Sequence, residues 1–461
     1  MRRSVTRVVL ATVLSAALIG LLIAPEASGR PGPMRFSKNT YAYTSSYGEP
    51  GLAIGSDGTV YVTTPGQGGA VLARSDNKGK TWTQLPTVTP SNSSPGTFTS
   101  GEDSEVAVAK NGTVYVGDLE IDGISVWKST DKGKTFPQET FVDGSADREW
   151  LAAEGKNTVY LAWHELASGT MLVAVSNDGG KTFSPPHTIY SQPTTAGESA
   201  RNGTSIGGIT ADGKGNVYAL YGVSRLDTTD TTYGTPPIST IHMSVSTDHG
   251  ATWNDYEVNP GAADANYGNF WMSSGVDKAG NVYAVYSGHA HKGEPMHVWL
   301  QESTDHGQTW SKPFMVDDKG GSDLFGWVAG GGPGVAVVAW YHSDDKNKDD
   351  DKAQWVVKVA QVRGLVNQSG KSNPHPDVQV ANASDHINHI GGICTLGTLC
   401  GVAPGSSSDR SLLDFFKVAV DPTGHPEVVW SDNNRPGTIK TGVGFARQTS
   451  GESALDPRIY H

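Results

Sequence analysis

The feature that most constrains the fold of this chain is an eight-residue turn motif, Ser-x-Asp/Asn-x-Gly-x-Thr-Trp/Phe, which occurs five times. The copies begin at Ser75, Ser129, Ser176, Ser246 and Ser303, and successive starts are 54, 47, 70 and 57 residues apart. Ser, Asp and Asn side chains bond backbone groups inside tight turns, and Gly adopts backbone angles that other residues resist. Five copies at this spacing predict a repeat protein in which every unit is one supersecondary element.

A second repeat runs in step with the first. Short apolar segments with a central Tyr precede the turn motifs, at 60–62, 114–116, 159–161, 217–219 and 282–284, and looser copies stand at 336–338 and 427–429. Another short strand lies upstream of each, so every unit predicts one four-stranded antiparallel blade. Seven units predict an all-β, seven-bladed β-propeller, with six blades as the alternative if the last two units form one irregular blade. We expect residues 34–43 to supply the outer strand of the last blade, which removes an open sheet edge.

The N-terminal residues have the pattern of a secretory signal peptide. Arg2, Arg3 and Arg7 precede the apolar run 8–24, and small residues at 27–29 provide a cleavage site. The general secretory route is favoured over twin-arginine export, because the rest of the twin-arginine motif is missing. We predict a secreted, extracellular protein in which residues 1–29 are the signal peptide and residues 30–461 form a single propeller domain, with a long irregular insertion loop at 364–408.

Charge and cysteine content limit which binding partners and which covalent links we expect. Residues 1–29 hold three Arg and one Glu, so removing them changes the formal net charge from −12 to −14. An acidic surface disfavours nucleic acid and anionic lipid, and no membrane insertion is expected. Cys394 and Cys400 are the only cysteines, and in an exported chain they predict a small disulfide loop. No cofactor or metal is expected, and the charged run 344–352 is interpreted as a solvated hairpin tip.

The turn motifs resemble the Asp boxes (BNR repeats) of the sialidase-like superfamily of β-propellers, over roughly residues 48–448. The resemblance implies that the boxes lie on the outer rim and are structural. In sialidases it also implies retaining hydrolysis of terminal sialic acid by three Arg, a Tyr with a Glu partner, and an Asp acid/base. This chain departs from that pattern, because sialidases have six blades and an early Arg-Ile-Pro type motif that is missing here. Lyases and binding proteins share the scaffold, so the fold alone does not decide the function.

Residues at the starts of the innermost strands of a propeller converge on the mouth of its central channel. Arg148, Arg201 and Arg410 fall at such positions on three blades, and guanidinium groups bind a carboxylate bidentately. They predict a site for an acidic sugar. The alternative is that these arginines pair with neighbouring carboxylates and hold the mouth together. Acidic residues at the same level include Asp103 and Asp414.

Catalytic groups are expected at the same mouth. Asp147, Glu49 or Glu105 could serve as acid/base, since glycosidic cleavage needs carboxyl groups with separated pKa values. The resemblance to sialidases suggests Tyr267 as nucleophile. Aromatic side chains at this level, Trp150 and Trp271, could stack on sugar faces, although core packing is the favoured interpretation for either one.

Three functions follow from these observations. The leading hypothesis is a secreted, sialidase-like, glycan-active enzyme, a glycoside hydrolase acting on an acidic sugar of a glycan or polysaccharide. The alternatives are a polysaccharide lyase on uronic-acid glycans and a non-catalytic propeller that binds glycan or protein. A closed propeller needs no partner to fold, so a monomer is expected.

Overall fold

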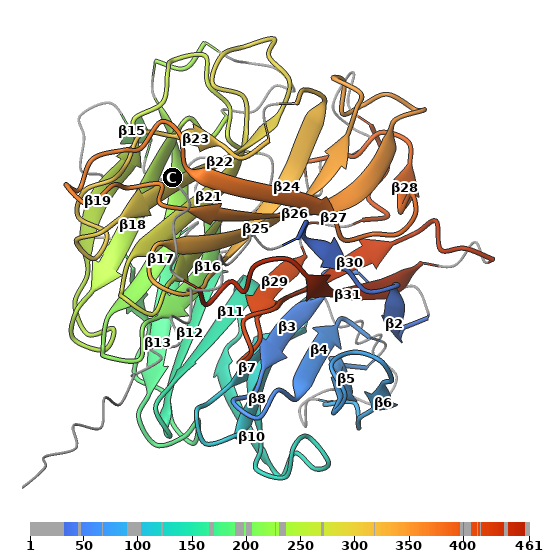
Figure 1. Ribbon diagram of the computed structural model, residues 1–461. Helices are drawn as coiled ribbons and strands as arrows, with labels where there is room; N and C mark the ends of the chain where they lie inside the picture. Colours follow the sequence, from blue (N-terminus) through green and yellow to red (C-terminus); the bar gives the residue numbers. More distant parts are fainter. Residues whose placement is uncertain are drawn as a thin grey trace, which may run out of the picture.

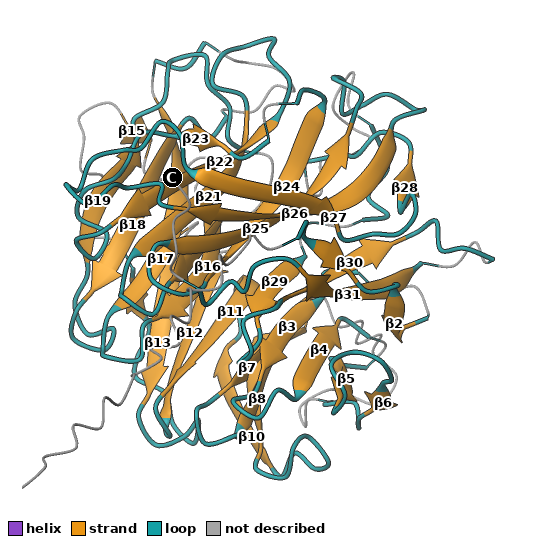
Figure 2. Ribbon diagram, in the orientation of Figure 1, coloured by secondary structure: helices purple, strands orange, loops and turns teal. Residues whose placement is uncertain are grey.

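The computed structural model is a ring of seven antiparallel β-sheets around a central channel (Figures 1 and 2). The residues that the structure describes are 32–44, 48–66, 68–89, 103–120, 123–165, 170–189, 198–199, 205–225, 227–229, 237–268, 272–317, 319–396, 400, 407–412, 414, 416–437 and 441–456. Within these ranges all regular structure is β, and no described segment is a helix long and apolar enough to cross a membrane.

The first three blades follow one another along the chain. Blade one contains β3 (Gly51–Ile54), β4 (Val60–Thr64), β5 (Val71–Ser75) and β6 (Thr83–Gln84). Blade two contains β7 (Asp103–Val108), β8 (Val114–Glu120), β9 (Gly123–Ser129) and β10 (Gln138–Asp143). Blade three contains β11 (Ala146–Glu154), β12 (Thr158–Glu165), β13 (Thr170–Ser176) and β14 (His187–Thr188).

The next three blades add short extra strands to the same plan. Blade four contains β15 (Glu198–Ser199), β16 (Ser205–Ala211), β17 (Val217–Arg225), β18 (Thr240–Ser246) and β19 (Asn254–Asn259). Blade five contains β20 (Ser273–Val276), β21 (Val282–Gly288), β22 (His297–Ser303) and β23 (Phe314–Met315). Blade six contains β24 (Ser322–Gly330), β25 (Val335–Ser343), β26 (Gln354–Arg363), β27 (Asp377–Asn382) and β28 (His389–Ile390).

Blade seven joins the two ends of the described chain. It contains β29 (Lys417–Val420), β30 (Pro426–Asp432) and β31 (Gly442–Ser450), and both β1 (Arg35–Phe36) and β2 (Thr40–Tyr43) pair with β31. The ring closes because β29 lies beside β3 (Figure 1). The seven-bladed prediction and the predicted N-terminal contribution to the last blade are both confirmed.

The five turn motifs are built by hydrogen bonds within each motif. In the fifth, the hydroxyl of Ser303 donates to Oδ1 of Asp305 (2.7 Å), and the amide of Gly307 donates to the Ser303 hydroxyl (2.8 Å). The amide of Thr309 donates to the same Asp305 oxygen (2.9 Å). Trp310 closes the turn through Nε1, which donates to the carbonyl of Gly307 (3.1 Å). The carboxylates of these motifs are therefore structural.

The third, fourth and fifth turn motifs each pack on a Tyr of the preceding blade, and this contact links the two sequence repeats. Gly250, in the fourth motif, lies over Tyr160 of β12, where a β-carbon would come within 3.4 Å of the Tyr160 ring. Its neighbour His249 adopts a positive φ of 58°, with Nδ1 3.5 Å from the Tyr160 hydroxyl. That hydroxyl donates to Glu154 (2.5 Å). A local turn thus becomes a contact between blades.

Two segments differ from expectation. β27 and β28 lie inside 364–408, so this segment is not wholly irregular: β27 is the outer strand of blade six. The run 344–352 does join β25 to β26, but it is not a fully solvated tip. Lys348 is only 3% exposed, with Nζ 2.9 Å from Asp349 Oδ1, and the Lys348 carbonyl accepts from the Ile393 amide. The Cys394–Cys400 disulfide is confirmed.

Candidate functional site

A buried ion cluster centred on Arg148 occupies the end of the channel where the inner strands begin. Nη2 of Arg148 lies 3.0 Å from Asp103 Oδ1, 3.2 Å from Glu49 Oε1 and 3.9 Å from Asp414 Oδ2. The four residues come from blades three, two, one and seven or the segments leading into them, and all four are buried. We call Glu49, Asp103, Arg148 and Asp414 the mouth cluster.

Backbone irregularities at the starts of the inner strands place these side chains. Arg148 and Glu49 adopt positive φ angles of 57° and 51°, and the β11–β12 register shifts between Asp147 and Glu149. For residues other than Gly this conformation costs about 1–2 kcal/mol. It persists only where surrounding contacts compensate, and it is common at functional sites. The ion pairs of Arg148 supply that compensation here.

Two carboxyl groups of the mouth cluster, those of Asp103 and Asp414, have raised pKa values. Asp103 hydrogen-bonds to Glu49, and burial raises the Asp103 pKa well above its ordinary value although Arg148 opposes the shift. Burial and the nearby Glu49 charge raise the pKa of Asp414 to about 6, against the lowering effects of Arg148 and Arg410. Such environments allow one carboxyl group to donate a proton while another stays ionised.

Arg410 lies at the outer side of the cluster. Its Nη2 atom is 2.8 Å from both carboxylate oxygens of Asp414, and its side chain is 32% exposed. Of the three arginines that the sequence predicts at the mouth, the structure thus brings Arg148 and Arg410 to one carboxylate, as the alternative interpretation expected. Arg201 and Trp271 lie outside the described residues.

An aromatic and ionic layer connects the mouth cluster to the channel. The rings of Trp150 and Trp327 lie 5.3 Å apart between centroids, and Nζ of Lys417 is 4.9 Å and 4.8 Å from their centroids. Lys417 forms an ion pair with Glu105, while Cζ of Arg148 lies 5.5 Å from the Trp150 ring centroid. We call Glu105, Trp150, Trp327 and Lys417 the plug.

The plug bears on the expectations for Trp150 and Glu105. Trp150 is 1% exposed and belongs to the hydrophobic core, so the structure favours packing over sugar stacking for this residue. Glu105 is buried and paired with Lys417, so it neutralises a buried ammonium group rather than lying free as an acid/base at the mouth. Lys417 was not recognised from sequence, although its position at the start of the inner strand of blade seven was the available signal.

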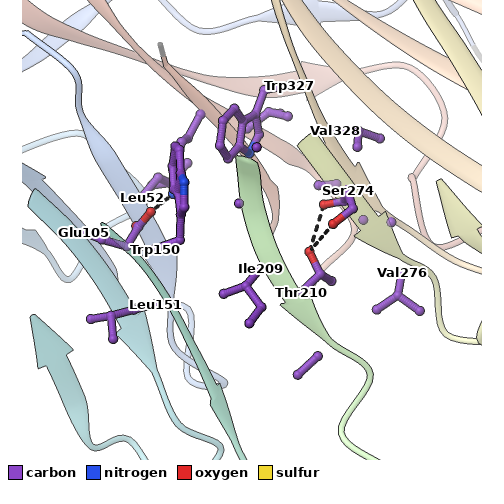
Figure 3. A pocket seen from close by; sticks show the side chains of 18 of the residues that line it. Leu52, Glu105, Trp150, Leu151, Ile209, Thr210, Ser274, Val276, Trp327 and Val328 are labelled. Carbon is purple, nitrogen blue, oxygen red and sulfur yellow. Dashed lines mark hydrogen bonds and ion pairs between the residues drawn. The ribbon is translucent and has the colours of Figure 1, made fainter. Parts of the chain in front are cut away.

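The channel is hollow next to the plug. A cavity of about 330 Å³ is lined by residues of all seven inner strands, with Trp150 and Trp327 at one side and Thr210 and Ser274 at another (Figure 3). The Thr210 hydroxyl donates to the Ser274 carbonyl (2.9 Å), and the Ser274 hydroxyl donates to Thr210 Oγ1 (3.0 Å). Both hydroxyl protons are thus donated within this pair of residues, so neither is left to donate to a ligand.

Two further predicted residues lie apart from the mouth cluster's ion pairs. Tyr267 is buried in the core with its ring 4.9 Å from that of Tyr286, and burial raises its pKa. The expectation that Tyr267 is the nucleophile gains no support, because its ring is packed among apolar side chains. Asp147 lies half-buried beside the β11 bulge, opposite His164. Its role as acid/base stays a prediction.

Asp103 and Asp414 are the carboxyl groups to which the sequence assigned no role. Both stand at inner-strand starts, as Glu49 and Arg148 do, and that position was the signal that could have identified them. The described ranges contain no group of three or more His, Cys, Asp or Glu arranged to hold a metal ion.

Fold and mouth cluster together define the class of this protein as an Asp-box β-propeller with seven blades and a carboxyl-rich channel mouth. The family model for the BNR/Asp-box repeat matches residues 301–312, which hold the fifth turn motif. This match confirms the resemblance predicted from the motifs. A search of curated proteins found no match.

Solved structures to which this chain is similar include carbohydrate-active proteins. A polysaccharide lyase described as an ulvan lyase is 10% identical, with a TM-score of 0.53, covering 89% of this chain and 95% of that one. An α-L-arabinofuranosidase of Fusarium graminearum in complex with arabinobiose is 12% identical (TM-score 0.43; 90% and 98% covered). A Hadza microbial sialidase is 13% identical (TM-score 0.44; 89% and 68% covered). At these identities the likeness concerns the propeller fold alone.

Proposed function

We propose that this protein is a glycan-active glycoside hydrolase whose active site is the mouth cluster. The observation that carries the proposal is the hydrogen-bonded pair of Asp103 and Glu49 beside Arg148, with Asp414 on the same guanidinium group. Three carboxyl groups around one cation can hold different protonation states at one pH. That is the requirement for hydrolysis of a glycosidic bond.

The roles follow from the environments. Asp414, with a pKa of about 6 and next to the partly exposed Arg410, is the proposed general acid that protonates the leaving oxygen as the bond to the anomeric carbon breaks. The ionised member of the Asp103–Glu49 pair is the proposed base or nucleophile. Water adds to the anomeric carbon and its proton passes to that carboxylate or to Asp414. Arg148 holds the carboxyl groups in register.

Two observations support a glycan as substrate. The ulvan lyase that shares this fold is a polysaccharide-cleaving enzyme, and the Asp-box motifs resemble those of sialidases. The predicted signal peptide at residues 1–29, which lies outside the described residues, supports the further proposal that the enzyme acts outside the cell. N-terminal sequencing of protein recovered from the culture medium tests this export; a start at Met1 would contradict it.

The central experiment incubates residues 30–461 with sialosides, uronic-acid polymers and neutral polysaccharides, and identifies the products by mass spectrometry. Hydrolysis adds one water per cleavage. We expect Asp414→Asn to lower the rate by about 10²–10⁴-fold while far-ultraviolet circular dichroism stays unchanged. Asp351→Asn, which changes an exposed carboxylate between β25 and β26, is the matched control and should retain full activity. No product from any glycan would contradict the proposal.

A second function, a lyase on uronic-acid glycans, has one observation in its favour. The rings of Tyr221 and His242, on adjacent strands of blade four, are stacked with centroids 5.4 Å apart, and both side chains are buried. A Tyr/His pair can move the proton that β-elimination removes from the carbon next to the carboxylate. Unsaturated products that absorb in the ultraviolet would select this function. Binding without cleavage would select a non-catalytic propeller.

A further inference from the structure

Both described arginines of the channel mouth already have protein carboxylates as partners. Arg148 contacts Asp103, Glu49 and Asp414, and Arg410 contacts both oxygens of Asp414. A sugar carboxylate could reach Arg148 only by displacing one of these groups. The displaced carboxylate would then be a buried charge without its partner, which is strongly unfavourable.

An independent observation on Glu149 shows what the mouth does offer to a ligand. Glu149 is 2% exposed, and neither of its carboxyl oxygens accepts a hydrogen bond from another described residue. It lies close enough to act electrostatically on both Arg148 and Asp103. The unused polar capacity around the mouth cluster is therefore that of the Glu149 carboxyl oxygens, which accept hydrogen bonds from hydroxyl groups, together with Nε of Arg410.

The overall charge acts in the same direction. Without residues 1–29 the formal net charge is −14, because those residues carry three Arg and one Glu of a chain at −12. A surface of this sign lowers the local concentration of an anionic polymer and leaves that of a neutral one unchanged. The pairing of Arg148 with protein carboxylates and the global field both disfavour an acidic substrate.

We infer that the mouth cluster takes an uncharged sugar, bound through its hydroxyl groups by the carboxyl groups of Glu49, Asp103, Asp414 and Glu149. This inference rests on the proposed function for the place of the site, and it replaces the acidic sugar that the arginines predicted. Arg148 and Arg410 then have a structural role, and the carboxyl oxygens select the substrate as hydrogen-bond acceptors. A substrate carboxylate brought next to them meets like charge, which lowers affinity.

The test compares substrates that differ only in charge. A uronic-acid polymer and the same polymer after carboxyl reduction share every linkage, and a sialoside and its carboxyl-reduced derivative form a second pair. These are measured beside a panel of neutral polysaccharides, by calorimetric binding at low and at 0.5 M salt and by product mass spectrometry. We expect neutral glycans to bind, and a reduced form to bind about tenfold or more tightly than its acid. Acid glycans that bind or react better than their reduced forms would overturn the inference.

A variant sharpens the result. In Asp414→Asn, Arg410 loses its charged partner and Arg148 loses one of three, so affinity for the acidic member of each pair should rise about tenfold. Arg225→Met, which removes a partly exposed cation paired with Asp227, should leave both affinities unchanged. Acid binding that is instead lost in Asp414→Asn would contradict the inference. Thermal unfolding of each variant confirms that it is folded.

The two proposals fail separately. Neutral glycans bound without turnover would end the proposed hydrolase and leave the uncharged-sugar inference standing. Hydrolysis of sialosides or uronides in preference to their reduced forms would end the inference and leave the hydrolase standing.

Discussion

The Nη2 atom of Arg148 lies 3.0 Å from Oδ1 of Asp103, and the two residues begin the inner strands of neighbouring blades. The same atom contacts Glu49 and Asp414, so one guanidinium group links four blades at the top of the channel. Arg148 therefore holds the ring together and sets the protonation of the groups proposed to act on substrate. Stability and activity are coupled through this residue.

Removing the Arg148 charge should lower the free energy of unfolding. Arg148→Met leaves three buried carboxyl groups around an apolar side chain, and breaking a buried ion pair from one side costs about 3–5 kcal/mol. Urea denaturation measures the loss in the free energy of unfolding. The control Arg225→Met, at an exposed ion pair, should change it by less than about 1 kcal/mol. Equal effects of the two variants would show that the mouth cluster contributes no special stability.

Glu105 and Lys417 of the plug should contribute to stability as a coupled ion pair. Lys417→Met leaves Glu105 unpaired in the channel, and Glu105→Gln leaves the Lys417 ammonium group unpaired, so each is expected to lower stability by about 3–5 kcal/mol. The double variant removes both charges and should recover most of that loss. A double-mutant cycle from denaturation curves gives the coupling energy. Additive single effects would contradict the pairing.

Stability should decrease as pH rises. Burial raises the pKa of Glu149 and of Glu427 to about 8 and that of Glu302 to about 7, from an ordinary value of 4.5. A carboxyl group with a raised folded pKa contributes fully below its unfolded pKa, and the contribution is lost as pH rises through the folded value. We expect unfolding free energy to fall by on the order of a few kcal/mol between about pH 4.5 and about pH 8.

Thermal denaturation at constant ionic strength measures this slope, and Glu302→Gln should flatten it around pH 6–7. Aspartates of the turn motifs, such as Asp305, have lowered pKa values, so their contributions are lost only at pH values below the ordinary 3.8. The turn-motif aspartates therefore do not change the slope of stability against pH between about pH 4.5 and about pH 8. A melting temperature that rises from pH 5 to pH 8.5 would refute the prediction.

The pH dependence of catalysis should report Asp414. If Asp414 is the general acid, kcat/KM falls as pH rises through about 6. Arg410 lowers the Asp414 pKa. Arg410→Met should therefore move the alkaline limb of the pH profile of kcat/KM to higher pH, by about 0.5–1 unit. Initial rates between pH 4 and pH 9 on the glycan cleaved by wild type provide the measurement. An unchanged alkaline limb in Arg410→Met would show that Asp414 is not the general acid.

The turn motifs should affect stability and leave catalysis alone. Asp305→Ala removes the acceptor of four hydrogen bonds, from Ser303, Gln308 and both the amide and hydroxyl of Thr309, and should cost about 1–2 kcal/mol. The neighbouring exposed Thr304 is the matched control, and Thr304→Ala should be nearly neutral. Loss of kcat without loss of stability in Asp305→Ala would contradict the structural assignment.

Much of the fold could be predicted because its information is local. A turn motif such as 303–310 carries donor, acceptor, glycine and aromatic within eight residues, and those residues bond one another in the structure. The apolar strand repeat, which has seven copies, then predicts the number of blades. The Cys394–Cys400 loop and the pairing of β1 and β2 with β31 follow from short separation and from the need to close an edge.

The chemistry of the mouth was decided by tertiary structure. Sequence placed Glu49, Arg148 and Arg410 at inner-strand starts, but whether a guanidinium group faces substrate or protein depends on distances between blades that no local pattern encodes. Glu105 and its partner Lys417 are 312 positions apart in the sequence. Tyr267 lies in the core, where its ring packs on that of Tyr286. Hydrogen bonds within a turn need only neighbours in the chain, whereas ion pairs and buried rings acquire their partners only when the ring closes.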